Sequence, residues 1–382
     1  MMMKKTLIIT MMLGTALSLL SQEYKPLLAE GKMWAIRSHL VPGTEYGDMY
    51  DYSDVKIEGS RIYEGKVYKR IYQRNVSYYV VIPPEWTFTG QLIGEEDGKI
   101  YILRTVGDEV RRELVMDFSL GVGDMLGSND DSQSTASCFP LHVVAVTDTV
   151  LVNSMDKTPR KCLHVQCLDN PSISDTWIEG IGSLKCGPWG VLNSDDEGSI
   201  PVLSGCNEGA TSLYRTVPFT NITWKLYGFG TVGEETIRRA AVMDGTYFFE
   251  DMSTLTFYDN GTIYGFASRN EVHGKYFVHG NDIEVPMFGG RKVGDIDDGP
   301  EMWDAMNTAT SYEMKDGHLL LYYNNRQNYL LFYKKEELIA GIESPVVSSA
   351  ASAPLYDLQG RRLSAKPVKG MYIQDGRKYV VK

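Results

Sequence analysis

The residues best suited to chemistry lie in one short strand-like stretch, Cys162-Leu163-His164. Residues i and i+2 of a β-strand share a face, so a thiol and an imidazole stand side by side there, as a nucleophile and its base would. Nucleophilic catalysis also needs a group that orients the base and an oxyanion hole, and the sequence shows neither. A structural cysteine is therefore the favoured interpretation, and no catalytic residue is predicted.

Two groups of residues have the chemistry of metal ligands. Glu271, His273 and His279 share one face of a regular strand, and carboxylates and imidazoles bind zinc. The six residues from His273 to His279 span roughly 20 Å, however, which is too far for one metal. The loop 295–299 offers calcium-type oxygens but lacks EF-hand spacing, and the acidic loops 129–131 and 195–197 are similar. All are interpreted as solvated turns, and neither a metal nor a cofactor is predicted.

All five cysteines fall in one region, at Cys138, Cys162, Cys167, Cys186 and Cys206. In an oxidising compartment they predict disulfides with one cysteine left over. Cys186 and Cys206 bracket a loop rich in Gly, Asp and Ser, and we expect these two to pair. Cys162 and Cys167 are an odd number of residues apart on one predicted strand, which argues against a bond between them. A zinc site would require closer CxxC pairs.

Four tryptophans are candidate platforms for sugars or peptides: Trp86, Trp177, Trp189 and Trp303. Tryptophans in β-domains more often fill the core, and core packing is the favoured interpretation. No P-loop, dinucleotide-binding glycine motif, GxSxG or HExxH pattern occurs. A glycosidase-type pair of carboxylates remains open, because its two members need not be close in sequence.

Composition excludes some functions and favours others. The chain of 382 residues has a formal net charge of −11, with 43% hydrophobic and 23% charged residues, which are ordinary values for globular proteins. Nucleic-acid binding is not expected, because neutralising phosphates requires a basic face. The 24 tyrosines favour β-strands.

The N-terminus has the pattern of a secretory signal peptide over residues 1–21. Lys4 and Lys5 precede an apolar run from Thr6 to Leu20. Cleavage is expected either at the small-x-small group 16–18 or after Ser21. No later stretch approaches the length of a membrane-spanning apolar helix, so the mature protein is predicted to have none.

Residues 22–216 predict a first, sandwich-like β-domain. A first strand is expected at 32–38, another at 78–82, and hairpins at Glu64-Gly65 and Asp97-Gly98. Gly180 and Gly182 are expected to adopt backbone conformations that side chains disfavour. The order GEEDGKIYIL, LVMDFSLGVGD, WIEGIGS resembles a domain of uncharacterised Bacteroidetes surface proteins, and this resemblance implies no activity.

Residues 217–335 predict a second β-domain, a small antiparallel barrel or curled sheet with a short helix at 301–306. Its hairpin signals are, in order, Asn260-Gly261 (with a type I′ turn), Gly280-Asn281, Asp316-Gly317 and Asn325-Arg326. The stretches LTFYDNGTIYG, GKYFVHGNDIEV and DGHLLLYY resemble META-type and, more generally, lipocalin-like domains. The resemblance implies this fold and no catalytic residue.

The chain ends with a linker at 336–354, rich in Ser, Ala and Pro, and a short β-segment at 355–382. The blocks YDLQGRRL, KGMYI and GRKYVVK resemble, in a shortened form, the C-terminal sorting segments of Bacteroidetes proteins exported by type IX secretion. The resemblance implies contact with the export machinery through these residues: Tyr356, Asp357, Gly360, Arg361, Gly370, Tyr372 and Lys382. The alternative is a final hairpin without an address function.

The sequence therefore predicts an all-β, mainly antiparallel protein that is secreted or attached to the cell surface. The expected function is non-catalytic binding of an unknown surface or extracellular macromolecule, or a structural role. Two alternatives stay open. One is a carrier for a small apolar ligand inside the second domain, and the other is a hydrolase with dispersed carboxylates.

Overall fold

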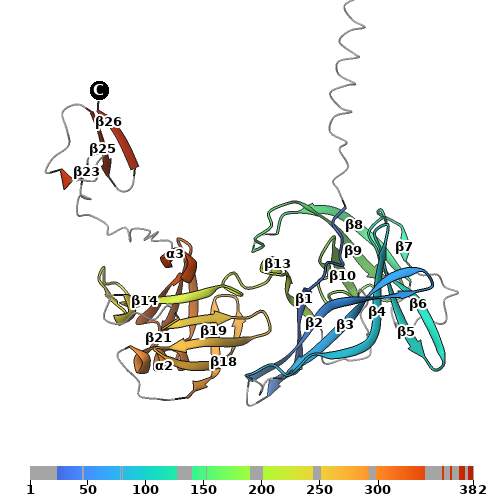
Figure 1. The fold of residues 1–382 in the computed structure, drawn as a ribbon, viewed down its shortest axis with the longest axis horizontal. Helices are drawn as coiled ribbons and strands as arrows, with labels where there is room; N and C mark the ends of the chain where they lie inside the picture. Colours follow the sequence, from blue (N-terminus) through green and yellow to red (C-terminus); the bar gives the residue numbers. More distant parts are fainter. Residues whose placement is uncertain are drawn as a thin grey trace, which may run out of the picture.

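The computed structural model of the protein (Figure 1) describes most of the chain from residue 24 onward. The described residues are 24–44, 47–77, 79, 81–126, 140–151, 153–189, 201–243, 251–291, 298–339, 355–356, 362–363, 370–374 and 377–381. The predicted signal peptide, Cys138 and the acidic loops at 129–131 and 195–197 lie outside them.

The first part of the chain forms two antiparallel sheets. The larger has eight strands in the order β13-β12-β1-β2-β3-β4-β5-β6, and the smaller has five in the order β11-β10-β9-β8-β7. Their bounds are β1 (Lys32–Thr44), β2 (Gly47–Tyr63), β3 (Lys66–Val76), β4 (Thr87–Glu96), β5 (Lys99–Val106), β6 (Glu109–Asp117), β7 (Met125–Leu126), β8 (Leu141–Thr149), β9 (Arg160–Cys167), β10 (Ser174–Ile178), β11 (Gly182–Ser183), β12 (Val202–Glu208) and β13 (Thr211–Arg215).

One hydrophobic core lies between these two sheets, and we call this unit the sandwich. Alternate residues of the large sheet, such as Trp34, Val55 and Ile71, pack against residues of the small sheet such as Leu163 and Trp177. This alternation follows from the two-residue period of a β-strand. It leaves the opposite face of the large sheet outside the core, and that outer face carries the site discussed below.

The second part of the chain closes on itself as a barrel. Strand β14 pairs with both β16 and β22, and the chain of pairings from β16 to β22 is complete. The bounds are β14 (Thr223–Thr231), β15 (Ile237–Arg239), η1 (Ala241–Met243), β16 (Thr254–Phe257), β17 (Thr262–Ala267), β18 (Asn270–His279), β19 (Asp282–Gly290), α2 (Gly299–Asn307), β20 (Ser311–Lys315), β21 (His318–Tyr323), β22 (Asn328–Lys334) and α3 (Lys335–Ile339).

Large apolar side chains fill the barrel. Its core includes Phe219, Trp224, Phe257 and Phe332, and Met302 and Met306 of α2 belong to the same cluster. Closure pairs the strands that would otherwise be exposed sheet edges. The sandwich core runs from Leu27 to Leu213, and the barrel core begins at Phe219.

The C-terminal segment contains four short strands in the order β24-β23-β25-β26. They are β23 (Leu355–Tyr356), β24 (Arg362–Leu363), β25 (Gly370–Gln374) and β26 (Arg377–Val381). Tyr356 pairs with Ile373, and Tyr372 is 5% exposed. Asp357, Gly360, Arg361 and Lys382 of the predicted sorting segment lie outside the described residues.

The all-β, antiparallel fold is confirmed, and so are several hairpins. Asp97 and Gly98 both have positive φ between paired strands, and so do Glu64-Gly65 and Asp316-Gly317. Gly280-Asn281 also joins paired strands. The glycines predicted to need unusual conformations have them, at φ +73° for Gly180 and +97° for Gly182.

Three local predictions are wrong. In the predicted strand at 78–82, Tyr79 lies in a turn and Ile82 in a bend, because the two prolines that follow end regular pairing. The predicted linker begins inside helix α3. The third error is the turn type at Asn260-Gly261, although the hairpin itself is present there. The predicted turn at Asn325-Arg326 is confirmed, since both residues have positive φ in the loop 324–327 between the paired strands β21 and β22.

Candidate functional site

The outer face of the large sheet carries a row of polar and small side chains. The strand registers place Gly205 opposite Ala35, Ala35 opposite Asp54, and Asp54 opposite Arg74. These residues alternate with the core residues of the same strands, so they point away from the sandwich core. The barrel packs on this row.

The barrel contributes the turn between β16 and β17, which we call the docked turn (Tyr258–Gly261). The backbone N–H of Gly261 donates to the carbonyl of Tyr258, and Gly261 has a φ of +71°. A type I′ turn requires positive φ at both central residues. Asn260 is not among the described residues with positive φ, so the predicted turn type is wrong. This is a longer turn that ends in a left-handed glycine. It projects Asp259 and Asn260 together.

Asn260 connects the barrel to Asp54 of the sandwich. Its Oδ1 accepts hydrogen bonds from the backbone N–H and the hydroxyl of Thr262, at 3.2 and 2.6 Å. Its Nδ2 therefore faces outward and donates to Asp54 Oδ2 at 2.8 Å. The asparagine amide can accept from Thr262 through its oxygen and donate to Asp54 through its nitrogen at once, which a carboxylate at this position could not do.

Asp54 receives further donors from its own sheet. Arg74 Nε and Nη2 both lie 2.9 Å from Asp54 Oδ2. Burial raises the pKa of the Asp54 carboxyl, and the charge of Arg74 and the Asn260 hydrogen bond oppose this only in part. The group is thus a buried carboxyl held by one cation and one amide.

Asp259 is the second buried carboxyl of the docked turn. Its Oδ2 accepts hydrogen bonds from the side-chain amides of Asn207, at 3.1 Å, and Asn221. Burial raises the pKa of this carboxyl as well, against the lowering effect of the surrounding donors. A Cβ on Gly205 would overlap the Asp259 carboxylate, so only glycine lets the turn reach the sheet.

An apolar cluster and a buried amine complete the interface. Tyr52 and Val76 of the sandwich pack with Phe277 of the barrel. Lys275 is 0% exposed, and its Nζ has no hydrogen-bond partner among the described residues. The Nζ lies 5.8 Å from the centre of the Tyr52 ring. Burial lowers the pKa of Lys275 to about 8, opposed by the charges of Asp51 and Asp54.

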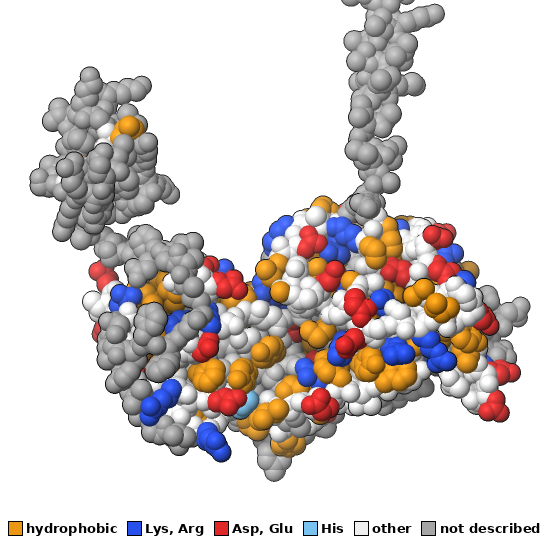
Figure 2. All heavy atoms as spheres, viewed as in Figure 1, with side chains coloured by type: hydrophobic (Ala, Val, Ile, Leu, Met, Phe, Trp, Pro, Cys, Tyr) orange, Lys and Arg blue, Asp and Glu red, His pale blue; other side chains and the backbone are white. Residues whose placement is uncertain are grey.

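A small hollow remains between the docked turn and the sheet, and we call it with its rim the interdomain corner. Its volume is about 70 Å³, and it is lined by Met33, Trp34, Ala35, Asp54, Arg74, Asn207, Asn221, Tyr258, Asp259 and Asn260. Met33 and Tyr258, at 36% and 37% exposed, form its rim. Figure 2 shows hydrophobic side chains gathered on both sides of the junction between the two domains.

The corner contains two carboxyls with raised pKa, which is the chemistry of a general acid. Its size argues against a substrate cleft, because ligand pockets typically enclose roughly 300–1,000 Å³. The Oδ2 atoms of both carboxyls are engaged by structural donors. Within the described part of the chain, no three His, Cys, Asp or Glu side chains converge as metal ligands.

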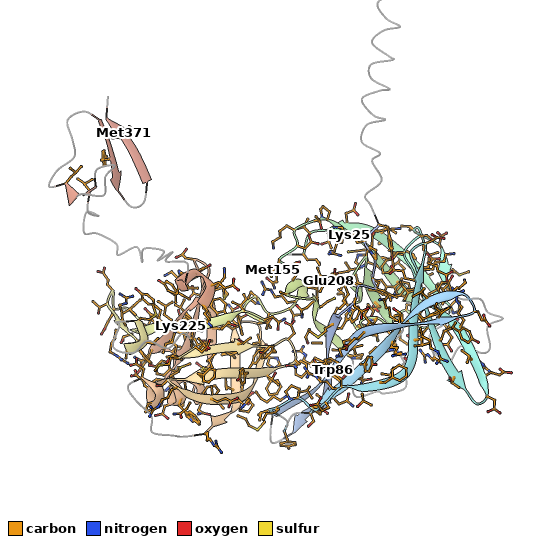
Figure 3. The ribbon with its side chains drawn as sticks, viewed as in Figure 1. Lys25, Trp86, Met155, Glu208, Lys225 and Met371 are labelled. Atoms are coloured by element: carbon orange, nitrogen blue, oxygen red, sulfur yellow. The ribbon has the colours of Figure 1, made fainter. Side chains whose placement is uncertain are left out.

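A larger hollow of about 300 Å³ lies on the sandwich, near Lys25 and Glu208, which are labelled in Figure 3. Its buried cations are already matched by acceptors. Lys32 Nζ donates to the Gly180 carbonyl at 2.9 Å and pairs with Glu208 at 3.3 Å. Arg160 pairs with Asp156 at 2.6 Å. Because acceptors already surround these cations, the charges that line the hollow do not indicate any particular class of ligand.

The thiol and imidazole singled out in the sequence do not form a catalytic pair. His164 Nδ1 lies 3.0 Å from the Thr176 hydroxyl, and its Nε2 lies 3.3 Å from the Thr147 hydroxyl. Cys162 Sγ instead faces the Arg160 carbonyl at 3.7 Å. Burial raises the pKa of the Cys162 thiol to about 11, which keeps it protonated and unreactive.

The predicted Cys186–Cys206 disulfide is not present, because the four described cysteines, at 162, 167, 186 and 206, are all free thiols. Cys206 is 0% exposed within the sandwich core. Cys186 lies in the turn after β11, where its N–H donates to the Ser183 hydroxyl at 2.7 Å. Burial raises the thiol pKa of both residues to about 12.

Three of the four tryptophans have packing roles. Trp177 is 0% exposed, Trp189 packs against the sandwich core, and Trp303 contacts Phe288 with ring centres 5.7 Å apart. Trp86 is half-buried on the sandwich surface (Figure 3). Arg74 and Lys56 lie 4.4 and 4.8 Å from its ring centre.

The predicted metal ligands are only partly together. His273 Nε2 lies 3.6 Å from Glu271 Oε1, whereas His279 ends its strand opposite Asp282. Within the calcium-type loop, residues 295–297 lie outside the described residues, and Asp298 instead bonds Arg238 at 2.7 Å.

Sequence reasoning missed Asp54, Asp259 and Lys275. The sequence pattern does not mark Lys275 as buried, because alternation places it on the same strand face as Glu271, His273 and His279, which is typical of a solvated face.

Comparison with known proteins gives no family. No family model and no curated protein matches the chain. Three solved structures match. A DUF4847 family protein from Bacteroides vulgatus is 18% identical, with TM-score 0.25, and the match covers 30% of this chain and 92% of that one. A protein from Burkholderia xenovorans is also 18% identical, with TM-score 0.25, covering 30% and 83%.

The third structure is a Bacteroides fragilis protein described as exported, with a YmcC-like fold. It is 12% identical, with TM-score 0.26, and the match covers 48% of this chain and 99% of that one. TM-scores of this size establish neither a shared overall fold nor a shared function. None of the helices in the described ranges is long and apolar enough to cross a membrane.

Proposed function

We propose that this protein is exported to the cell surface and acts there as a non-catalytic binding protein, with the interdomain corner as its binding surface. The observation that carries the proposal is that two separate β-units are held against each other by buried polar contacts, so that residues of both form one surface. Met33, Arg74 and Asn207 come from the sandwich, and Asn221 and Tyr258 from the chain that leads into and forms the barrel.

The composition of the corner supports binding of a macromolecule. Tyr, Met and Arg are enriched at the centres of protein interfaces, and flanking amides supply hydrogen bonds of either direction. Met33 and Tyr258 expose over a third of their surface directly beside the hollow. A macromolecule can insert one side chain or sugar substituent there and rest on the rim.

The binding test uses the mature protein and a panel of mucins, host matrix proteins and dietary glycans immobilised on a surface. The variant Met33→Ala/Tyr258→Ala is expected to reduce binding roughly tenfold or more, as for interface hot spots. Val110→Ala, which alters an exposed residue of β6, is the matched control. Equal binding by the two variants would show that the interdomain corner is not the binding surface.

Export is tested by fractionation of cells that make the full chain or a chain ending at Ala353. The signal-like residues 1–21 and the sorting-like residues 355–382 support surface delivery, through contact of the C-terminal segment with the export machinery. The full chain is expected at the surface and the shortened chain in the periplasm. Equal surface levels of the two would show that the C-terminal segment has no address function.

A hydrolase is a second candidate, because Asp54 and Asp259 line the same hollow and both have raised pKa values. The test measures hydrolysis of chromogenic glycosides and peptides by the mature protein and by Asp259→Asn. Hydrolysis that is lost in Asp259→Asn would favour this candidate over the non-catalytic one. The third candidate, a small-ligand carrier, is disfavoured by the apolar side chains that fill the barrel.

A further inference from the structure

The docked turn contains the one Asn-Gly dipeptide of the chain, Asn260-Gly261. An asparagine followed by glycine can lose ammonia when the glycine backbone nitrogen attacks the side-chain carbonyl carbon, because glycine has no Cβ to hinder the approach. The N–Cγ bond forms, the Cγ–Nδ2 bond breaks, and ammonia leaves. Water then opens the resulting cyclic imide to aspartate or isoaspartate. A neutral amide becomes a carboxylate.

Docking blocks this reaction. Asn260 is 6% exposed, and its Oδ1 is held by Thr262 while its Nδ2 is held by Asp54. The attacking atom is the backbone nitrogen of Gly261, and its N–H donates to the Tyr258 carbonyl at 3.0 Å. The side chain must release Thr262 and Asp54 and rotate, and Gly261 must lose its proton, before the new bond can form. Release of Asp54 requires the turn to leave the sheet, whereas the contacts with Thr262 and Tyr258 lie within the barrel hairpin itself.

The product would prevent the turn from docking again. A carboxylate at position 260 would face Asp54 Oδ2, and neither group has a proton to donate unless one is taken up. Two facing acids in a buried site repel each other and lose the hydrogen bond that joined them. Isoaspartate would also lengthen the backbone of a turn that lies against Tyr52, where even a Cβ on Gly261 would come within 2.7 Å of the ring.

We propose that Asn260 is a deamidation site controlled by domain docking, so that each opening of the interface can convert it irreversibly and leave the two β-units apart. Deamidation in the docked turn thereby separates the two β-units irreversibly, and the contact with Asp54 protects Asn260 from deamidation while the interface is formed.

The first experiment follows conversion at Asn260 in the mature full chain during incubation in mildly alkaline buffer. Peptide mapping by mass spectrometry measures conversion, with Asn153-Ser154 as the internal reference. Slow conversion is expected in the native protein. In Asp54→Ala the rate at Asn260 is expected to rise on the order of tenfold, the equivalent of one charged hydrogen bond, with no change at Asn153. Phe277→Ala, which loosens the apolar part of the interface, gives the same test if Asp54→Ala fails to fold.

Conversion of native Asn260 as fast as in a synthetic peptide of residues 255–266 would overturn the proposal. An unchanged rate in both variants would do so as well.

The second experiment tests the consequence. Asn260→Asp is expected to open the molecule, measured as faster protease cleavage in the segment 216–222 and a larger radius of gyration by solution scattering. The double variant Asp54→Asn/Asn260→Asp restores one donor and one acceptor across the interface and is expected to close it again. An Asn260→Asp protein that stays as compact and protease-resistant as the native chain would show that deamidation releases nothing.

Discussion

Two turns of the barrel carry similar sequence signals and have opposite environments. Asp316-Gly317 forms a tight turn in solvent, and a Cβ on Gly317 would meet nothing within 4 Å. Asn260-Gly261 lies against the sandwich, and a Cβ on Gly261 would come within 2.7 Å of the Tyr52 ring. A turn dipeptide thus predicts where the chain reverses, whereas the surface that the turn meets decides whether it has a further role.

The charges around the two turns differ in the same way. On the hairpin of the exposed Asp316-Gly317 turn, Glu313 accepts a hydrogen bond from the partly exposed Tyr322 at 2.7 Å. Beside the docked turn, Asp54, Asp259 and Lys275 are all buried. Buried charges depend strongly on each partner, whereas exposed ones are screened by water.

The largest expected effect comes from adding one methyl group to each turn. Gly261→Ala is expected to lower the free energy of unfolding by about 3–4 kcal/mol, because it combines a left-handed backbone with overlap against Tyr52. Gly317→Ala, which has the backbone effect alone at φ +84°, is expected to lower it by about 1–2 kcal/mol. Urea unfolding of both variants measures the difference, and equal losses would mean that the turn is not docked in solution.

A smaller effect is expected from removing one arginine of each environment. Arg74→Ala leaves the buried Asp54 with Asn260 as its remaining side-chain donor, and is expected to lower the free energy of unfolding by about 2–3 kcal/mol. Arg111→Ala removes an arginine whose side chain is 33% exposed and pairs at 3.6 Å with Glu109, which is 76% exposed, and is expected to change the free energy of unfolding by about 0–1 kcal/mol. Thermal unfolding of both proteins measures the difference, and equally small losses would mean that Asp54 is solvated because the interface is open.

The smallest effect concerns the two buried lysines of the barrel. Lys275→Met removes a buried amine without a hydrogen-bond partner in the described structure, and is expected to raise the free energy of unfolding by about 1–2 kcal/mol at neutral pH. Lys225→Met breaks the 3.0 Å hydrogen bond from Lys225 to the Met252 carbonyl, and is expected to lower it by about 1 kcal/mol.

The pH dependence gives a second test of Lys275. Its pKa is about 8 in the folded protein against an ordinary value of 10.5, so between these values the unfolded chain binds more protons than the folded chain. The contribution of Lys275 to stability therefore rises with pH across this window. Urea unfolding from pH 8 to 10.5 is expected to show this rise in the native protein and a flatter profile in Lys275→Met. Identical profiles would mean that the amine is solvated.

Much of the local structure could be predicted from the sequence. Glu64-Gly65, Asp97-Gly98 and Asp316-Gly317 need positive φ at both turn positions, and this requirement acts between neighbouring residues. The prediction failed at Asn260, where a side chain that could have favoured a tight turn instead bonds Thr262 and Asp54. The predicted Cys186–Cys206 bond failed for a related reason, since spacing along the chain does not show which way each thiol packs.

Alternating apolar residues and turn dipeptides were enough to establish an antiparallel β-protein, because both act over a few residues. The meeting of Asp54 with Asn260, more than two hundred positions apart, could not be inferred in this way. It depends on which outer face of the sandwich the barrel covers, and on two glycines, Gly205 and Gly261, whose missing side chains leave room for contact. Long-range packing of that kind leaves no periodic trace in a single chain, so the candidate site emerged only from the folded arrangement.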